Sequence, residues 1–140
     1  MPLPSEPGPK CVFCDIVAGT APAYKVFEDE KTLAFLDLFP FTRGHLLVIP
    51  KRHGARLTDF GHADQAAVIQ TLERMVRRAE RLAPDYNVAL NAGAKAGQIV
   101  FHLHFHVIPR YGEANPFHPS ARVKLTDDQA RDVVAELSAP

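Results

Sequence analysis

Three histidines at every second position form the stretch of the chain that is richest in chemistry. They lie in the run Phe101-His102-Leu103-His104-Phe105-His106-Val107-Ile108-Pro109, where hydrophobic residues fill the alternate positions. Strict alternation predicts a β-strand with one buried face. The hydrophobic residues then face the core, and the three imidazoles line the other face at intervals of roughly 6.5 Å.

Aligned imidazoles have three possible uses: a polar sheet surface, a metal site or nucleophilic catalysis. A regular repeat of three argues against an ordinary surface. The outer two lie roughly 13 Å apart along a strand, whereas zinc needs each ligand nitrogen at about 2 Å, so one ion does not easily bind all three. A neutral imidazole is a good nucleophile toward phosphorus. The spacing therefore favours a central His104 that attacks while its neighbours orient it and move protons.

The loop before this run is rich in glycine and reads Asn91-Ala92-Gly93-Ala94-Lys95-Ala96-Gly97-Gln98. Glycines let backbone N–H groups approach an anion. Alone, the loop is equally consistent with a long hairpin. Directly before the three histidines it predicts a phosphate-binding loop.

Cys11 and Cys14 form a Cys-x-x-Cys pair near the N-terminus. Such a pair is compatible with redox chemistry, with metal binding or with chance. A thioredoxin-type pair would be expected near a βαβ unit, which the pattern here does not provide. Zinc would need two further ligands, and two buried reduced cysteines without metal are the alternative.

The elements that must position these residues follow from local patterns. The region 64–82 has hydrophobic residues at a spacing of three and four and charged residues on its other face, which predicts a long helix. Thr126-Asp127-Asp128-Gln129 predicts a capping box that opens a short helix to about Leu137. The expected fold is α+β, with an antiparallel five-stranded sheet and one long and one short C-terminal helix. The expected strands are 24–28, 32–36, 45–50, 86–91 and 101–110, with a hairpin turn at 29–31.

Composition limits the classes of function. The chain has 140 residues, 16 Lys and Arg against 16 Asp and Glu, 46% hydrophobic residues, two cysteines and seven histidines. We expect a single domain over residues 11–140 after a flexible N-terminal arm at 1–10. Zero net charge argues against nucleic acid as a partner, and no hydrophobic run approaches a membrane span. The proline-rich start is not typical of a signal peptide, so a cytoplasmic location is expected.

The run Gly97-Gln98-x-Val100-Phe101-His102-x-His104-x-His106-Val107-Ile108-Pro109 resembles the motif of the histidine-triad (HIT) family. The resemblance extends upstream through 27–29, 34–37 and 44–53, and covers roughly residues 11 to 111. It implies a HIT-like fold, a homodimer, and hydrolysis or transfer at a nucleoside α-phosphate through a nucleotidyl-histidine.

The resemblance also implies roles for individual residues. His104 would be the nucleophile, His106 would contact the phosphate and assist the leaving group, and His45 would help to bind phosphate. Gln98 and Asn91 would lie near the leaving group and the phosphate, with Gly97 beside them. The nucleoside would contact Asp37 at the ribose and a hydrophobic clamp at the base, for which core packing is the alternative reading: Val12, Phe13, Ile16, Phe35 and Leu38.

In the branch of the family with an N-terminal cysteine pair, the resemblance implies a structural zinc ion. Its ligands here would be Cys11, Cys14, His53 and His102. That assignment gives His102 a structural role and leaves the chemistry to His104. Lys51 is a local cation that could assist the anion site, while His62 and His118 receive no role.

The expected substrate is a purine nucleoside phosphoramidate or a related adenylated molecule, which would release an AMP or GMP moiety. The alternatives are a dinucleoside polyphosphate hydrolase or phosphorylase and, from another class, a nucleotide-binding regulatory or scaffold protein. Ile99 departs from the Ser or Thr that many relatives have after the motif glutamine, so one phosphate contact is missing. The tryptophan of some relatives' C-terminal part is also absent.

Overall fold

The computed structural model describes residues 11–112 and 122–138. One antiparallel sheet forms the centre of the molecule, with the strand order β1-β2-β3-β5-β4. The strands are β1 (Lys25–Glu28), β2 (Thr32–Leu36), β3 (Leu46–Pro50), β4 (Asp85–Leu90) and β5 (Phe105–Arg110). The helices are α1 (Val12–Ala18), α2 (His62–Ala79) and α3 (Asp127–Ser138), with short 3-10 turns at Leu57–Asp59 and Ala94–Ala96. The expected α+β class with five antiparallel strands is confirmed.

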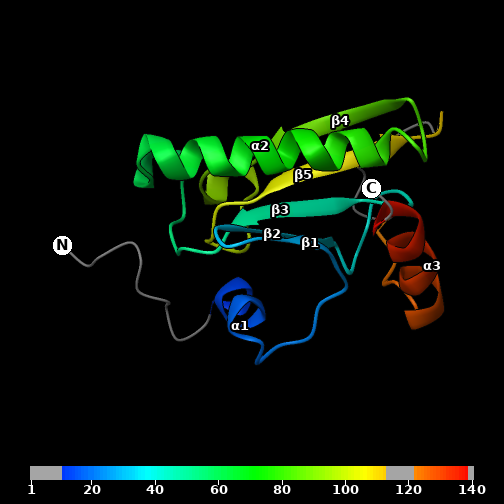
Figure 1. The fold of residues 1–140 in the computed structure, drawn as a ribbon, viewed down its shortest axis with the longest axis horizontal. Coiled ribbons are helices and arrows are strands. Elements are labelled where there is room, and N and C mark those ends of the chain that lie inside the picture. The colour runs from blue at the N-terminus through cyan, green and yellow to red at the C-terminus, as the bar shows by residue number, and fades with distance from the viewer. Residues whose placement is uncertain (1–10, 113–121, 139–140) are drawn as a thin grey trace.

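The two faces of the sheet are covered differently (Figure 1). The long helix α2 lies along one face, and the short helix α1 lies against the other. Strands β2 and β3 are buried at every position, because their alternate side chains enter two separate hydrophobic clusters. On the α2 side Leu46 and Val48 pack with Met75, whereas on the α1 side Leu47 and Ile49 pack with residues of α1.

Local hydrogen bonds define several element ends as the sequence predicts. The Asp29 carboxylate accepts from the N–H groups of Lys31 at 3.0 Å and Thr32 at 2.8 Å, which closes the β1–β2 hairpin. At the start of α3, Thr126 Oγ1 accepts from the Gln129 N–H, and Gln129 Oε1 accepts from the Thr126 N–H. Both the hairpin turn and the capping box are confirmed.

The helix bounds and the last strand differ from expectation. Helix α2 begins at His62 and ends at Ala79, rather than spanning 64–82. Regular strand structure in β5 begins only at Phe105, so the expectation of a strand from residue 101 is wrong for its first four residues. Phe101 is 48% exposed rather than in the core. The cause is a long-range contact: the Leu103 N–H donates to the Gly54 carbonyl at 2.7 Å and pulls this segment toward the loop after β3.

Helix α1 was not expected from the sequence. It has only seven residues, and its N-terminal cap is the Cys11 sulfur, which accepts from the Cys14 N–H at 3.3 Å. Its inner face buries Phe13 and Ile16. None of the helices within the described ranges is both long and hydrophobic enough to cross a bilayer. The expected arm at 1–10 lies outside the described residues.

Candidate functional site

Two cysteines and two histidines meet at the junction of α1, the loop after β3 and the segment before β5. The ligand atoms of Cys11, Cys14, His53 and His102 all lie within 4.8 Å of one another. Cys14 Sγ is 3.2 Å from His53 Nδ1, and Cys11 Sγ is 3.5 Å from His102 Nδ1. The four residues that the sequence proposes as zinc ligands are therefore brought together from three separate segments.

The donor atoms of the Cys/His cluster suit a metal cation. His102 Nε2 lies 2.7 Å from the Pro50 carbonyl oxygen, which can only accept, so Nε2 bears the proton and Nδ1 presents its lone pair to the sulfurs. Such an outer hydrogen bond is what orients a metal-binding imidazole. Burial, with Cys11 close by, raises the pKa of Cys14 to about 12, so the free thiol keeps its proton and a metal ion would have to displace it. Two sulfurs and two imidazole nitrogens are a donor set that zinc prefers.

His104 has one ring nitrogen fixed by the backbone and one left for chemistry. Its Nδ1–H donates to the carbonyl oxygen of His102 at 2.7 Å. The lone pair is therefore on Nε2, the atom a nucleophilic imidazole uses. Burial lowers the pKa of His104, which favours this neutral form. The edge of the Phe13 ring packs against the imidazole with a centroid distance of 5.1 Å and restricts its rotation.

His45 and His106 form a second, directional pair. The Phe41 N–H donates to His45 Nδ1 at 3.0 Å, so the His45 proton is on Nε2. That Nε2–H donates to His106 Nδ1 at 2.9 Å, and the His106 proton is then on its own Nε2. Burial lowers the pKa of His106 to about 4 and holds that of His45 far below its usual value. The pair is thus neutral at pH 7, with one N–H donor at its outer end.

Asp37 follows β2 and is buried beside this pair. One carboxylate oxygen accepts from the Phe39 N–H at 2.8 Å, and the other pairs with Arg122 Nη2 at 2.7 Å. Burial raises the pKa of Asp37, and these two partners oppose the rise. Asp37 is therefore held by its neighbours rather than solvated at a turn.

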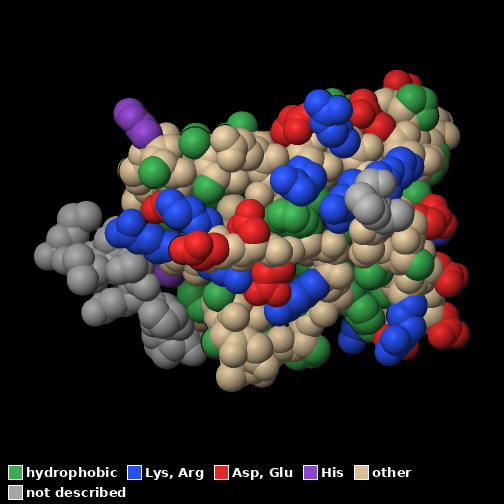
Figure 2. All heavy atoms as spheres, viewed as in Figure 1, with side chains coloured by type: hydrophobic (Ala, Val, Ile, Leu, Met, Phe, Trp, Pro, Cys, Tyr) green, Lys and Arg blue, Asp and Glu red, His purple; other side chains and the backbone are tan. Residues whose placement is uncertain are grey.

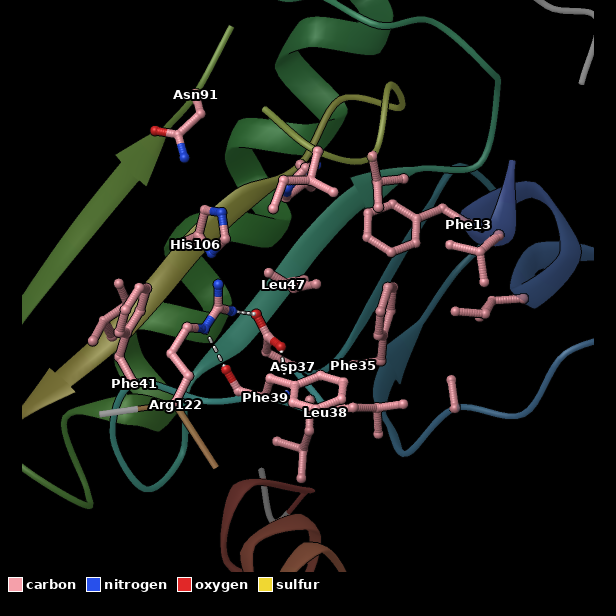
Figure 3. A pocket seen from close by; sticks show the side chains of 18 of the residues that line it. Phe13, Phe35, Asp37, Leu38, Phe39, Phe41, Leu47, Asn91, His106 and Arg122 are labelled. Carbon is pink, nitrogen blue, oxygen red and sulfur yellow. Dashed lines mark hydrogen bonds and ion pairs between the residues drawn. The ribbon is translucent and has the colours of Figure 1, made fainter. Parts of the chain in front are cut away.

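A cavity of about 960 Å³ opens on the α1 side of the sheet in front of these groups. Figure 3 shows hydrophobic side chains on one flank, among them Phe13 and Phe35, and the polar groups Asp37, Arg122 and His106 on the other. Most positions expected to contact substrate line it, namely Val12, Phe13, Ile16, Phe35, Asp37, Leu38, Asn91 and Gly97, together with His104 and His106. His45, which was expected to help bind phosphate, is buried, donates to His106 and is not among the lining residues. Gly97 has φ +92°, which favours glycine at this bend of the loop.

Gln98 occupies a different place from the one expected of a residue that contacts the leaving group. Its side chain is buried and is not among the cavity-lining residues. Oε1 accepts from the Gly93 N–H at 2.8 Å, and Nε2 donates to the carbonyls of Ala55 at 3.0 Å and Val100 at 3.1 Å. All its principal hydrogen-bonding groups are therefore used to hold the loop.

The structure also bears on the expectations for Lys51 and Ile99. Lys51 is not part of the cavity lining, and its Nζ pairs with Glu28 at 2.7 Å, so it is not the local cation of this site. Ile99 lines the cavity mouth with 82% of its surface exposed and offers no hydroxyl. His62 is exposed at the start of α2, and His118 lies outside the described residues.

Sequence reasoning missed Arg122, Phe39 and Phe41, all of which line the cavity. No local pattern marks Arg122, which lies 85 residues from its partner Asp37. Its charge is no signal either, because the chain has 16 Lys and Arg.

An imidazole row beside a buried carboxylate and a hydrophobic cavity, on a five-stranded antiparallel sheet, defines the class of HIT-domain proteins. The family model described as the HIT domain matches residues 18–113, and the chain belongs to this family. An uncharacterized HIT-like protein of Mycobacterium tuberculosis is 51% identical over 102 residues, or 71% of this chain and 70% of that protein. An adenosine 5'-monophosphoramidase of Candida albicans is 40% identical over 123 residues, or 84% and 81% of the two chains.

Solved structures support the same assignment. A Zn-bound histidine triad family protein from Mycobacterium smegmatis superposes with a TM-score of 0.75 at 39% identity, over 92% of this chain and 94% of that one. The zinc in that protein supports the interpretation of the Cys/His cluster as a candidate zinc site. The family includes hydrolases, such as the Candida enzyme.

Proposed function

We propose that this protein is a nucleotide hydrolase that cleaves a purine nucleoside phosphoramidate, or a related adenylated substrate, at the α-phosphate. The observation that carries the proposal is the state of His104, whose Nδ1–H is held by the His102 carbonyl so that Nε2 is the nucleophilic atom at a cavity large enough for a nucleotide. Similarity to the Candida monophosphoramidase points to the same class of substrate.

The proposed reaction consists of two displacement steps at the α-phosphorus. In the first, His104 Nε2 forms a bond to the α-phosphorus while the bond to the leaving amine breaks, and the amine departs with the electron pair and takes a proton. The outer Nε2–H of His106, supported from behind by His45 Nε2–H, donates a hydrogen bond to the phosphate, and the leaving nitrogen takes its proton from solvent in the open cavity. In the second, water attacks the phosphorus, gives up a proton to solvent, and releases the nucleoside monophosphate and free His104.

The remaining groups would bind the nucleoside. Asp37 has carboxylate lone pairs beyond those its neighbours use, which suits ribose hydroxyls. The aromatic edge contact between Phe13 and Phe35, with ring centroids 5.3 Å apart, forms one wall of a hydrophobic slot for a base. Asn91 and Gly97 line the cavity next to each other and would approach the phosphate.

The Cys/His cluster would hold a structural zinc ion through Cys11, Cys14, His53 and His102. Bound there, zinc neutralises the two thiolates and ties α1 to the segment before β5. Phe13 and Ile16 of α1 line the cavity, so the cluster would also hold one wall of the nucleotide site. Metal analysis of chelator-free protein should find about one equivalent of zinc.

A homodimer is part of the same proposal. Strand β4 pairs with β5 and forms one edge of the sheet among the described residues. Tyr86, Val88 and Leu90 project from it at alternate positions, and each is more than a third exposed. An exposed edge of this kind is suited to pairing with a second copy. Light scattering should give twice the chain mass, and a monomer at micromolar concentration would contradict the proposal.

A substrate panel tests the function directly. Adenosine phosphoramidate, guanosine phosphoramidate, diadenosine tri- and tetraphosphate and an adenylated lysine would be compared for wild type, His104→Ala and the control His62→Ala. We expect the phosphoramidates to be the best substrates, with kcat/KM reduced at least about 1,000-fold in His104→Ala and unchanged in His62→Ala. Preference for the dinucleotides would favour the alternative enzyme. Tight nucleotide binding without turnover in wild type would favour a binding protein.

A further inference from the structure

Arg122 reaches the candidate active site from the segment before α3. Its Nε–H donates to the Phe39 carbonyl at 2.6 Å, and Nη2 pairs with the Asp37 carboxylate at 2.7 Å. The guanidinium also stacks over the Phe41 ring at 4.3 Å from its centroid, and that ring stacks in turn on His45. Three independent contacts therefore fix the orientation of this charged group.

The cavity has almost no other charge. Among the described residues that line it, Arg122 is the only Lys or Arg and Asp37 the only carboxylate. Burial lowers the pKa of His106, and the charge of Arg122 lowers it further, so this imidazole is neutral. An anionic phosphate in front of these imidazoles would thus find one full positive charge within the described part of the site.

Arg122 keeps N–H donors that can reach a phosphate bound in the cavity. A guanidinium has five N–H donors, of which the contacts to Phe39 and Asp37 use two. Figure 3 shows the guanidinium between the His106 ring and the Asp37 carboxylate. Asp37 also retains lone pairs, so the ribose and Arg122 can share this carboxylate.

We infer that Arg122 is a phosphate-binding residue of this site, which donates to a non-bridging oxygen of the nucleotide while it stays anchored on Asp37 and Phe39. The inference rests on the proposed function and adds the positive charge that the neutral imidazoles do not supply. A planar guanidinium in a partly buried position binds phosphate strongly, and charge that develops on the oxygens during displacement would strengthen the contact.

Calorimetric titration of the full chain with AMP and with adenosine separates phosphate binding from all other roles, because the two ligands differ only in the phosphate. We expect Arg122→Gln to weaken AMP binding by about tenfold or more and adenosine binding by less than about twofold. Arg122→Lys should fall between wild type and Arg122→Gln for AMP, since it keeps the charge but loses the planar donors. The control is Arg43→Gln, which removes another ion pair to the C-terminal region, with Glu136 at 2.6 Å, outside the cavity.

The outcomes are distinguishable. Equal weakening of AMP and adenosine in Arg122→Gln would show that Arg122 only positions Asp37 and its loop, and would overturn the inference. Unchanged AMP affinity would overturn it as well. A wild-type chain that binds neither ligand would overturn the proposed function and this inference together, whereas intact AMP binding and hydrolysis in Arg122→Gln would remove Arg122 alone.

Discussion

His102 and His104 lie two residues apart, yet their surroundings give them opposite uses. His102 is completely buried and both of its ring nitrogens are occupied, one by cysteine sulfurs and one by the Pro50 carbonyl. His104 has a single nitrogen fixed and lines an open cavity with the rest of its ring. An imidazole with no nitrogen left can only hold structure, whereas one with a free lone pair can react.

A single backbone carbonyl group also connects the Cys/His cluster to His104. The carbonyl oxygen that fixes the His104 tautomer belongs to His102, whose side chain is part of the Cys/His cluster. A disturbance of the cluster therefore reaches the nucleophile through one residue. Within one motif, His102 is therefore placed for a structural role, and its carbonyl holds the proposed nucleophile His104.

Loss of a cluster ligand is expected to have the largest effect on stability. Cys14→Ser should abolish zinc binding and lower the free energy of unfolding by about 3 kcal/mol or more, which corresponds to roughly 10 °C in Tm. Thermal unfolding and metal analysis would measure both. His62→Ala, a histidine outside the cluster, is the control. Equal Tm values for wild type and Cys14→Ser would contradict a structural role for the cluster.

The activity of Cys14→Ser tests whether the cluster is structural or takes part in the chemistry. Well below its Tm, Cys14→Ser should retain measurable hydrolysis, because His104 and His106 are still present. His104→Ala should be folded and close to inactive. A Cys14→Ser protein that is stable yet completely inactive would contradict this expectation and would show that the reacting groups depend on the intact cluster.

Acid should destabilise the fold through the buried imidazoles. The unfolded chain protonates His106 near pH 6.5, whereas the folded chain does so only near its lowered pKa of about 4. Since the unfolded state binds more protons in this window, stability falls as the pH drops from about 6.5 to 4, by up to about 1.4 kcal/mol per pH unit for this group. Denaturant titrations across the window would measure the slope.

The variant His106→Asn separates the contribution of His106 to this pH dependence from the loss of a cluster-bound metal in acid. His106→Asn removes the titrating group and leaves an amide oxygen that can accept from His45 Nε2–H. Its slope should be shallower than that of wild type, while Cys14→Ser should retain the His106 contribution. Parallel slopes for wild type and His106→Asn would mean that His106 titrates normally in the folded protein.

The sheet and the long helix could be predicted because their signals are local. A run of aliphatic residues marks β3, alternation marks β5, a spacing of three and four marks α2, and the capping sequence Thr126 to Gln129 marks α3. Figure 2 agrees with the neutral composition as well, since acidic and basic side chains lie next to one another on the face shown and form no separate fields.

What the sequence could not predict depends on contacts between distant segments. Helix α1 is too short for a periodic signal and depends on its sulfur cap and on burial of Phe13. Residues 101–104 leave the strand because Gly54 and Pro50 hold them. Arg122 reaches Asp37 across 85 residues, and no motif records that ion pair.

Substitution of Gln98 is expected to have the smallest effect of these changes. It tests whether this side chain positions the loop or takes part in the reaction. Gln98→Ala removes the three hydrogen bonds that hold the loop, and should cost about 1–2 kcal/mol of stability. Gln65→Ala is a matched control, because Gln65 also donates to two loop carbonyls, those of Leu57 at 3.0 Å and Phe60 at 3.1 Å, but lies outside the cavity lining.

The kinetic constants of the two glutamine variants separate the roles. If Gln98 only positions the loop, Gln98→Ala raises KM severalfold through displaced Gly97 and Asn91, kcat stays within about threefold of wild type, and Gln65→Ala changes neither constant. If the Gln98 amide contacted the leaving group in the transition state, kcat would fall about 100-fold or more, as when one transition-state donor is removed. A fall of that size would return Gln98 to the reacting groups, because loss of a loop contact acts first on binding and the chemical step depends on the imidazoles.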